Sequence, residues 1–203
     1  MLVFTIAVDG PAAAGKGTLS KRLAQETGFA YLDTGLLYRA TGFKTLQGFN
    51  AIEAAESLVP EDFLNPELRS AEVGQAGSIV SAIPEVRKVL FDQQRRFARQ
   101  TGGAILDGRD IGTNICPEAE VKFFVTASPE ARAKRRMNEL KDTSMTFENM
   151  LADIVARDER DSSRATNPLR PAEDAILLDT SKMSIQDVYD TAFDCVQKTL
   201  KSL

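Results

Sequence analysis

The chain opens with a short apolar run that leads directly into a glycine-rich segment. Residues Val3 to Val8 are followed by GPAAAGKGT at positions 10–18, and a helical pattern then runs from Lys16 to Glu26. An apolar run of this kind, with both faces apolar, indicates a buried strand. A glycine turn between a strand and a helix lets several backbone N–H groups point inward and adds the positive N-terminal end of the helix. The segment therefore predicts a cradle for phosphate groups, which Lys16 also reaches.

Four further short apolar runs indicate strands, at Ala30 to Leu32, Ala104 to Leu106, Val121 to Val125 and Ala175 to Leu178. Helical patterns lie between them. Thr27-Gly28 is a stop signal, Ser128-Pro129-Glu130 is a helix start, and Ser184 with Asp187 resembles a capping box. Alternating strands and helices predict an α/β fold, a parallel sheet with helices on both faces. In such sheets ligands bind at the carboxyl ends of the strands.

Composition excludes several classes of function. With 203 residues, 43% of them hydrophobic, the chain can bury the core of one domain. A net charge of −4 argues against binding to nucleic acid or to an anionic membrane, and the absence of histidine excludes imidazole catalysis and histidine zinc sites. Cys116 and Cys195 are too few for a zinc site and suit a reducing cytoplasm. No apolar run approaches the ~20 residues of a membrane span, and the N-terminus does not resemble a signal peptide.

The glycine-rich segment departs from the general P-loop pattern at one position. Gly17 stands where a Ser or Thr usually meets magnesium, and the hydroxyl comes one place later, at Thr18. Asp107, at the end of the third predicted strand, is placed to orient magnesium-bound waters. We therefore expect Mg²⁺ to bind with the nucleotide near Thr18 and Asp107, mainly through water.

Three charged segments follow predicted strands or helices: DTGLLYR at 33–39, LDGRDIGT at 106–113 and RDERDSSR at 157–164. If the last is helical, a step of ~100° per residue puts Arg157, Arg160, Asp161 and Arg164 on one face. One carboxylate cannot neutralise three arginines, so this face predicts a clamp for an anion on a lid that closes over it. Asp158 points elsewhere, toward an apolar stripe, and needs a partner arginine.

GPAAAGKGT, DTGLLYR, SIVSAIPEVR, LDGRDIGT and RDERDSSR, in this order, resemble the bacterial cytidylate kinases, which are nucleoside monophosphate kinases of the P-loop class. The resemblance covers nearly the whole chain, although Thr41 to Arg69 is shorter than the insert of many members. It implies a five-stranded parallel core forming one kinase domain over residues 1–203, with an acceptor-nucleotide subdomain at 35–99 and an arginine-rich lid at 128–171.

The resemblance also implies the site residues. ATP would bind to Gly10, Pro11, Ala12, Ala13, Ala14, Gly15, Lys16, Gly17 and Thr18. The acceptor, CMP or dCMP, would bind to Thr34, Arg39, Ser78, Arg87, Arg109, Asp110, Arg157, Asp161 and Arg164. Among these, Arg39, Arg109 and Arg164 would hold its phosphate, Ser78, Arg87 and Asp110 its cytosine, and Arg157 with Asp161 its sugar. Catalysis would rest on Lys16, Arg109, Arg157 and Arg164, together with Arg132 and Arg136 of the helix Pro129 to Leu140.

Several alternatives stay open on the residues alone. Ser78 and Arg87 fit an ordinary exposed helix face, and Arg132 and Arg136 fit a solvated ion-pair helix with Glu130 and Glu139. A UMP/CMP-type kinase, a sugar kinase related to shikimate or gluconate kinase, a bare ATPase and a non-enzymatic nucleotide sensor are the other functions to consider. We expect ATP and CMP or dCMP as the only ligands besides magnesium, and a monomer.

Overall fold

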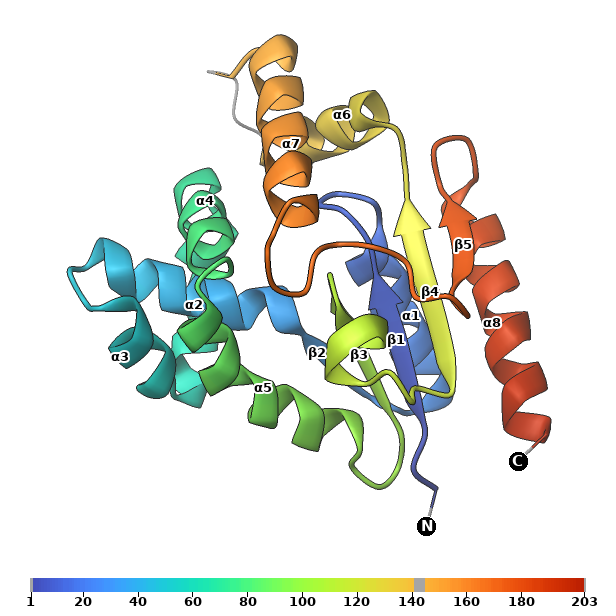
Figure 1. Ribbon diagram of the computed structural model, residues 1–203. Coiled ribbons are helices and arrows are strands. Elements are labelled where there is room, and N and C mark those ends of the chain that lie inside the picture. The colour runs from blue at the N-terminus through green and yellow to red at the C-terminus, as the bar shows by residue number, and fades with distance from the viewer. Residues whose placement is uncertain (1, 141–144, 203) are drawn as a thin grey trace. The chain divides into compact units, whose positions relative to one another are not determined.

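The computed structural model describes residues 2–140 and 145–202. The chain divides into two compact units: residues 1–32 with 97–203, and residues 33–96 (Figure 1). The bounds of the second unit are close to those of the acceptor subdomain expected at 35–99. Part of the lid expected at 128–171, residues 141–144, lies outside the described residues.

The first unit is built on a five-stranded parallel sheet with the strand order β2-β3-β1-β4-β5. The strands are β1 (Thr5–Asp9), β2 (Ala30–Asp33), β3 (Ala104–Gly108), β4 (Val121–Thr126) and β5 (Ile176–Asp179). Each of them coincides with one of the predicted apolar runs, which confirms the predicted α/β fold. Asp9 pairs in register with Gly108 of β3 and with Phe124 of β4, so the carboxyl ends of these three strands lie at one edge of the sheet.

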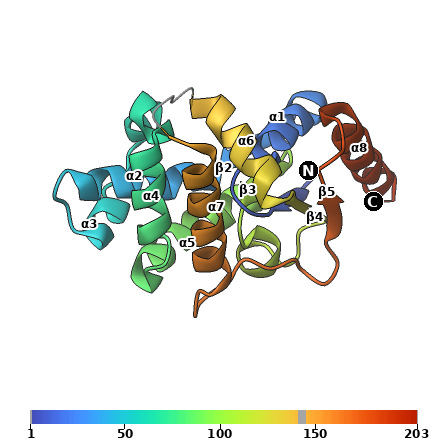
Figure 2. The ribbon, with the colours of Figure 1, turned by 90° about the horizontal axis from the view of Figure 1, so that it is seen from above.

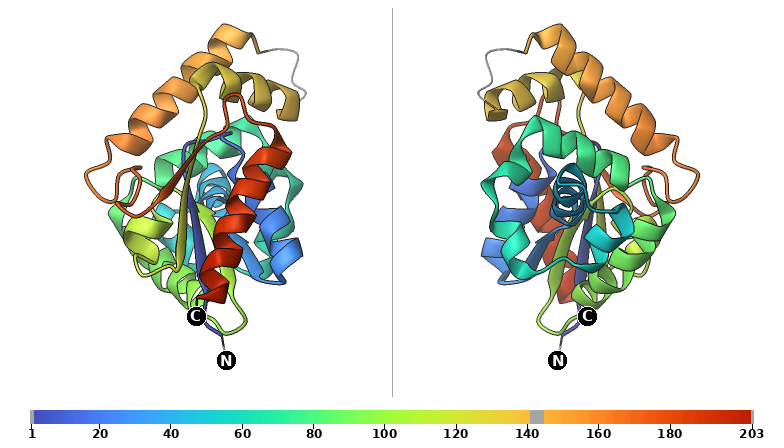
Figure 3. Two further views of the ribbon diagram at one scale, coloured as in Figure 1. Left: turned by 90° about the vertical axis from the view of Figure 1, so that its right-hand side faces the viewer. Right: turned by 90° about the vertical axis from the view of Figure 1, so that its left-hand side faces the viewer.

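Among the described residues of the first unit, five helical elements accompany this sheet, apart from the end of α5. They are α1 (Lys16–Thr27), the short π-helical turn η3 (Ile111–Ile115), α6 (Pro129–Leu140), α7 (Phe147–Ser162) and α8 (Ile185–Lys201). Leu19 and Leu23 of α1 share one apolar core with Val188 and Ala192 of α8, so both helices cover the same face (Figure 2). Helix α8 runs along the strands (Figure 3, left), and η3 lies on the opposite face (Figure 1).

Two predicted helix ends are confirmed: the C-terminal end of α1 and the N-terminal end of α8. Gly28 ends α1 in the left-handed conformation, with φ 72°. Ser184 starts α8 with a complete capping box, in which the Ser184 hydroxyl accepts the Asp187 N–H and the Asp187 carboxylate accepts the Ser184 N–H. Both signals are local in sequence, which is why they could be recognised without a structure.

Two expectations about single elements are wrong. The second and fifth strands are not buried: in β2 Ala30 is exposed and the other residues are half-buried, and Leu177 of β5 is 65% exposed, because β2 and β5 are the two edge strands of the sheet. The helix that carries RDERDSSR does not reach Arg164, since α7 ends at Ser162 and Ser163 is its C-terminal cap. Arg164 therefore belongs to the segment that leaves the helix.

The second unit is helical, and its described residues contain no strand beyond the end of β2, as the sequence predicts. It comprises α2 (Thr34–Leu46), α3 (Ala51–Glu56), the short 3₁₀ helices η1 (Pro60–Leu64) and η2 (Pro66–Arg69), α4 (Ala71–Val80) and most of α5 (Pro84–Ala98). Helix α2 is its centre and packs closely on α4. Gly42 and Gly77 permit this approach, because a Cβ on Gly42 would lie 2.5 Å from the backbone nitrogen of Gly77.

Among residues 2–140 and 145–202, no helix has both the length and the apolar character that crossing a bilayer requires. Cys116 is buried, Cys195 is half-buried, and neither forms a disulfide.

Candidate active site

The glycine-rich segment forms a tight loop between β1 and α1, as predicted. Gly10 has φ 146°, and a Cβ at this position would lie 1.9 Å from the carbonyl oxygen of Val125, so no other residue fits. Ala13 and Gly15 also have positive φ, 59° and 98°, and Gly15 is the N-terminal cap of α1. Backbone of this kind directs consecutive N–H groups to one side and forms an anion-binding concavity at a helix N-terminus.

The carbonyl groups of this loop accept hydrogen bonds from side chains, one from the loop's own Lys16 and the others from distant segments of the chain. Lys16 Nζ donates to the carbonyl oxygen of Pro11 at 2.9 Å. The carbonyl oxygen of Ala12 accepts from Arg132 Nη1 at 3.3 Å, and that of Ala14 accepts from Thr180 Oγ1 at 3.0 Å and from Arg135 Nη1 at 3.4 Å. Sequence reasoning missed Thr180, because its partner is the backbone of a loop more than a hundred residues away.

A cavity of about 310 Å³ adjoins the cradle within the first unit. Ala13, Ala14, Gly15 and Thr18 line one side, and residues of α6, of the segment after β5 and of α8 line the others: Arg135, Asn138, Glu139, Thr180, Met183, Ile185, Val188 and Tyr189. The guanidinium group of Arg22 lies 3.7 Å from the centre of the Tyr189 ring at this wall. Sequence analysis did not identify this cavity.

Asp107 faces the cradle from the neighbouring strand. Its Oδ2 accepts a hydrogen bond from the Tyr31 hydroxyl at 2.6 Å, and a Cβ on Gly17 would lie 3.6 Å from the same oxygen. The missing side chain of Gly17 therefore leaves the space beside Asp107 open. Across residues 2–140 and 145–202, no three His, Cys, Asp or Glu side chains are grouped as ligands for a metal. The arrangement suits Mg²⁺ held through water and nucleotide phosphates, which is the ordinary way proteins bind this ion in nucleotide sites.

Asp161 of α7 is the centre of a buried charge network. Its side chain is 2% exposed; Oδ2 accepts from Arg109 Nε at 2.8 Å, and Oδ1 accepts from Arg164 Nη2. Burial by itself would raise the pKa of Asp161, but Arg109, Arg164 and Arg157 outweigh it and hold the pKa below its usual value. Burial would likewise lower the pKa of Arg109, and Asp161 reverses the direction. Both groups are therefore charged near neutral pH.

This network adds a residue that helical spacing could not show. Asp161 pairs with Arg164 of its own segment and also with Arg109, which follows β3, so two arginines share this one carboxylate. The spacing on a helical wheel could not show a partner that arrives from another part of the chain.

Arg132 and Arg136 of α6 differ sharply in their surroundings. Arg132 is 3% exposed, and its Nε donates to the carbonyl oxygen of Ala127 at 2.8 Å, while both of its terminal nitrogens bond to Asp158. Asp158 thus has the arginine partner that the sequence left open. Arg136 Nη1 lies 3.2 Å from Glu139 Oε2 in an exposed pair, which is the arrangement expected of a solvated ion-pair helix.

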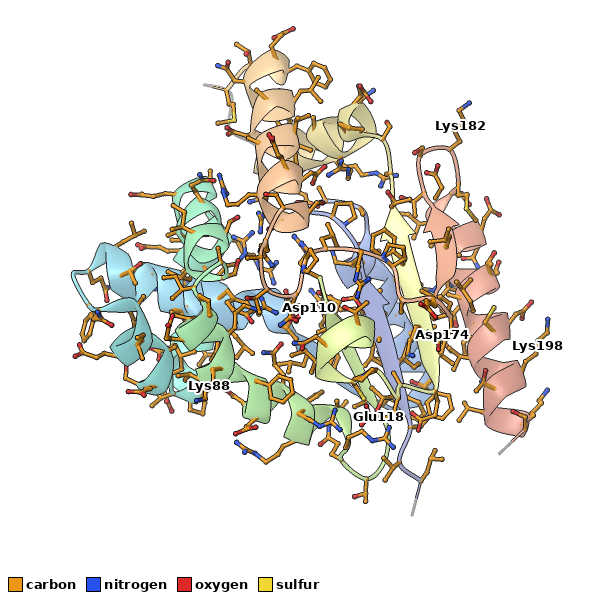
Figure 4. The ribbon with its side chains drawn as sticks, viewed as in Figure 1. Lys88, Asp110, Glu118, Asp174, Lys182 and Lys198 are labelled. Carbon is orange, nitrogen blue, oxygen red and sulfur yellow. The ribbon has the colours of Figure 1, made fainter. Side chains whose placement is uncertain are left out.

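Asp110 directly precedes the turn η3 and lies where β3 ends (Figure 4). Its side chain is buried, and Oδ2 accepts from Asn114 Nδ2 at 3.1 Å. It makes no hydrogen bond to the N–H groups of η3. The N–H groups of Ile111 and Gly112 bond instead to Asp9, a residue that sequence analysis did not single out.

The second unit carries the remaining predicted acceptor-site residues. Thr34 and Arg39 belong to α2, Ser78 to α4 and Arg87 to α5. Arg39 Nη1 donates to the carbonyl oxygen of Leu68 at 2.7 Å, and its guanidinium group lies against Gly74 of α4. Ser78 and Arg87 are buried, so the interpretation as an ordinary exposed helix face is wrong; Arg87 Nη1 reaches the carbonyl oxygen of Ser81, and its guanidinium group lies 5.7 Å from the Tyr38 ring. A buried cation in a helical unit is costly unless it is bonded or binds a ligand.

The parallel sheet and the cradle before α1 define a protein of the P-loop class. Solved structures support this at the level of the fold: an uncharacterized protein from Eubacterium ventriosum (TM-score 0.57, 16% identity, covering 100% of both chains) and a gluconokinase from Sinorhizobium meliloti (TM-score 0.54, 12% identity, covering 98% of this chain and 94% of the other).

The sequence comparisons narrow the class to one family. The family model for cytidylate kinase matches residues 6–198. A cytidylate kinase from Cereibacter sphaeroides is 55% identical over 196 residues, 96% of this chain and 95% of its own length. Another from Methylocella silvestris is 52% identical over 207 aligned positions, 98% of this chain and 96% of its own length. The chain belongs to the cytidylate kinase family, and a sugar kinase is not favoured.

Proposed function

We propose that this protein transfers the γ-phosphoryl group of ATP to CMP or dCMP, giving ADP and CDP or dCDP. Its membership of the cytidylate kinase family supports the reaction. The observation that carries the proposal is the buried network of Arg109, Asp161 and Arg164, which lies beyond β3, the direct neighbour of the strand that leads into the cradle. A phosphate cradle and a second cationic centre in one unit are what a transfer between two phosphates requires.

The donor nucleotide would bind along the first unit. The N–H groups of Gly10 to Thr18 and the ammonium group of Lys16 would hold the phosphates, and the adjoining cavity of about 310 Å³ would take the adenine. Magnesium, when bound, neutralises charge on the phosphate oxygens. Thr18 and Asp107 are the residues of this chain that would hold it, mainly through water. Tyr31 fixes the orientation of Asp107 through its hydroxyl.

The chain's own residues would catalyse the transfer by position and charge. The attacking oxygen of the acceptor phosphate is already anionic, so no general base is required, and a protein without histidine lacks nothing for this step. Lys16, Arg109, Arg157 and Arg164 would neutralise the charge on the transferring group. Arg136 could join them by leaving its exposed pair with Glu139. Arg132 makes the carbonyl and carboxylate contacts described above, which favours a supporting role over direct contact with phosphate.

We assign the acceptor's phosphate to Arg39, Arg109 and Arg164 and its sugar to Arg157 and Asp161. A carboxylate offers about four lone-pair positions, so Asp161 can accept a sugar hydroxyl besides its two arginine partners. Asp110 would accept from the amino group of cytosine, while Arg87 and Ser78 would bond to its ring. Thr34, at the start of α2, would complete the set. Uracil presents the opposite polarity at these positions and would leave buried groups without partners.

Initial rates of ADP formation with CMP, dCMP, UMP, AMP, gluconate and shikimate test this proposal. We expect the highest kcat/KM with CMP or dCMP, and a CMP to UMP ratio that falls by about one to two decades in Asp110→Asn, the size of one specific hydrogen bond. The exposed Asp194→Asn on α8 is the control and should leave the ratio unchanged. Turnover of a sugar acceptor alone contradicts the proposal, and ATP binding without turnover on any acceptor indicates a nucleotide sensor.

The setting of this activity is part of the same proposal. We propose a role in pyrimidine nucleotide metabolism in the cytoplasm, with 33–96 acting as the acceptor subdomain and the α6–α7 region as the lid. A monomer that binds neither nucleic acid nor membrane remains a prediction from the sequence. Light scattering of the purified protein, with and without nucleotides, checks the oligomeric state.

A further inference from the structure

Asp9 is a buried carboxylate to which the proposed reaction assigns no role. It is the last residue of β1, directly before Gly10 of the cradle, and it is 4% exposed. Its two oxygens accept one backbone hydrogen bond each: Oδ1 from the N–H of Ile111 and Oδ2 from the N–H of Gly112, both at 2.8 Å. These bonds join residues more than a hundred positions apart in the chain.

The two N–H groups belong to the first turn of η3. The opening N–H groups of a helical turn have no partner inside it and are usually capped by the preceding side chain. Here the preceding residue is Asp110, whose side chain makes no such bond. Asp9 therefore caps the turn from the neighbouring strand. The carboxylate of Asp110 is therefore not required to cap the turn that follows it.

The position of Asp9 makes it a direct link between the end of β1 and the segment that carries Arg109 and Asp110. Asp9 stands in register with Gly108, the residue immediately before that segment. Gly112 lies close against it, since a Cβ there would lie 3.5 Å from Asp9 Oδ2 and 3.1 Å from Lys122 Cδ. The backbone of residues 109–112 is thus fixed by the sheet on one side and by the two Asp9 bonds on the other.

We propose that Asp9 is a positioning residue for acceptor recognition: by holding the N–H groups of Ile111 and Gly112, it sets the direction in which Asp110 meets the base. This inference rests on the proposed function. It predicts that base selectivity depends on a side chain that touches neither nucleotide.

Asp9→Asn tests this with the smallest change of shape. An amide offers one acceptor and one NH₂ donor, so one of the two backbone N–H groups loses its partner and faces another donor. We expect the CMP to UMP ratio of kcat/KM to fall about tenfold through a higher KM for CMP, the scale of one lost hydrogen bond. ATP affinity, measured by calorimetry, should change less than about twofold, because the hydrogen bond that is lost does not belong to the cradle that binds ATP.

Glu120→Gln is the matched control. Glu120 also accepts a backbone N–H of β1, from Thr5 at 2.6 Å, but at the amino end of that strand, the end marked by Glu118 in Figure 4. The Glu120→Gln variant should have a lower thermal stability and an unchanged CMP to UMP ratio of kcat/KM. In the double variant Asp9→Asn/Asp110→Asn the ratio should fall no further than in Asp110→Asn alone, because both changes act on the same contact.

An unchanged ratio in a folded Asp9→Asn, an equal fall in Glu120→Gln, or additive effects in the double variant would overturn the inference. Asp9→Ser is the second variant should Asn not fold, and the same fall is expected, since serine reaches at most one N–H. Hydrogen exchange of the wild-type protein needs no substitution: the amides of Ile111 and Gly112 should be protected, and exchange at the rate of open loops contradicts the capping. If the wild type does not phosphorylate CMP, the proposed function fails while the exchange result still reports on Asp9.

Discussion

Arg132 of α6 and Asp158 of α7 form a two-pronged ion pair: Nη1 donates to Oδ1 at 2.9 Å, and Nη2 donates to Oδ2. The same guanidinium group bonds to the carbonyl oxygens of Ala127 and of Ala12. One side chain therefore joins the two arginine-bearing helices to the end of β4 and to the cradle.

Asp158→Asn should destabilise the protein by about 1–3 kcal/mol, because it leaves a buried guanidinium without its charged partner. Urea denaturation measures the free energy of unfolding. Glu139→Gln, which breaks the exposed pair with Arg136, is the control and should cost less than about 0.5 kcal/mol. Equal losses in the two variants would mean that the Arg132 pair is no more than a surface contact.

Lys16→Ala should reduce the rate of phosphoryl transfer by at least about a hundredfold, because it removes the positive charge next to the β and γ phosphates. Lys21→Ala, an exposed position of the same helix, should leave kcat unchanged. Single-turnover rates with CMP measure the step itself. A Lys16→Ala protein that keeps more than about a tenth of the wild-type rate argues against the cradle as the donor site.

Arg164→Ala should raise the KM for CMP and lower kcat while ATP affinity stays intact, because the acceptor phosphate loses one of its cations. Helical spacing alone predicts equal or slightly higher stability, through relief of repulsion between arginines. The structure reverses that sign: the buried Asp161 loses one of its two arginine partners, and we expect a loss of stability of about 1–3 kcal/mol. Calorimetry with CMP and ATP, together with thermal unfolding, separates the two effects. The exposed Arg170→Ala is the control, and unchanged CMP affinity in Arg164→Ala refutes the phosphate assignment.

The stability of the protein should depend on pH through Asp9. Burial raises the pKa of Asp9 to about 7, against the opposing effect of the Gly112 and Ile111 N–H groups, whereas the unfolded chain has the ordinary value near 3.8. The folded state therefore binds more protons than the unfolded state between these two pH values. The contribution of Asp9 to the free energy of unfolding consequently falls as the pH rises from about 4 to 7, and it stays constant above pH 7.

Urea denaturation of the wild type and of Asp9→Asn at pH 5 and pH 8 isolates the contribution of Asp9 to the free energy of unfolding. The wild type should lose about 2–3 kcal/mol relative to the variant between the two pH values, from ~1.4 kcal/mol per pKa unit. A difference between the two proteins that is the same at both pH values rules out a raised pKa at Asp9.

The sequence predicts the features that depend on neighbouring residues. The cradle, the positions of the five strands and the caps at Gly28 and Ser184 all follow from short local patterns. The end of α7 was misplaced because Ser162-Ser163 carries no glycine or proline stop signal. The partners Arg132–Asp158 and Asp9–Ile111 could not be predicted, since each pair is brought together by the packing of distant segments.

The hydrogen bonds that side chains donate to the carbonyl groups of the cradle have a thermodynamic consequence. Pro11, Ala12 and Ala14 are each held by a side chain before any nucleotide arrives. Fixing a backbone residue costs ~1–2 kcal/mol of conformational entropy, and here that cost falls on folding rather than on nucleotide binding. The loop thus meets its ligand already ordered, so the free energy of the phosphate contacts is available for affinity.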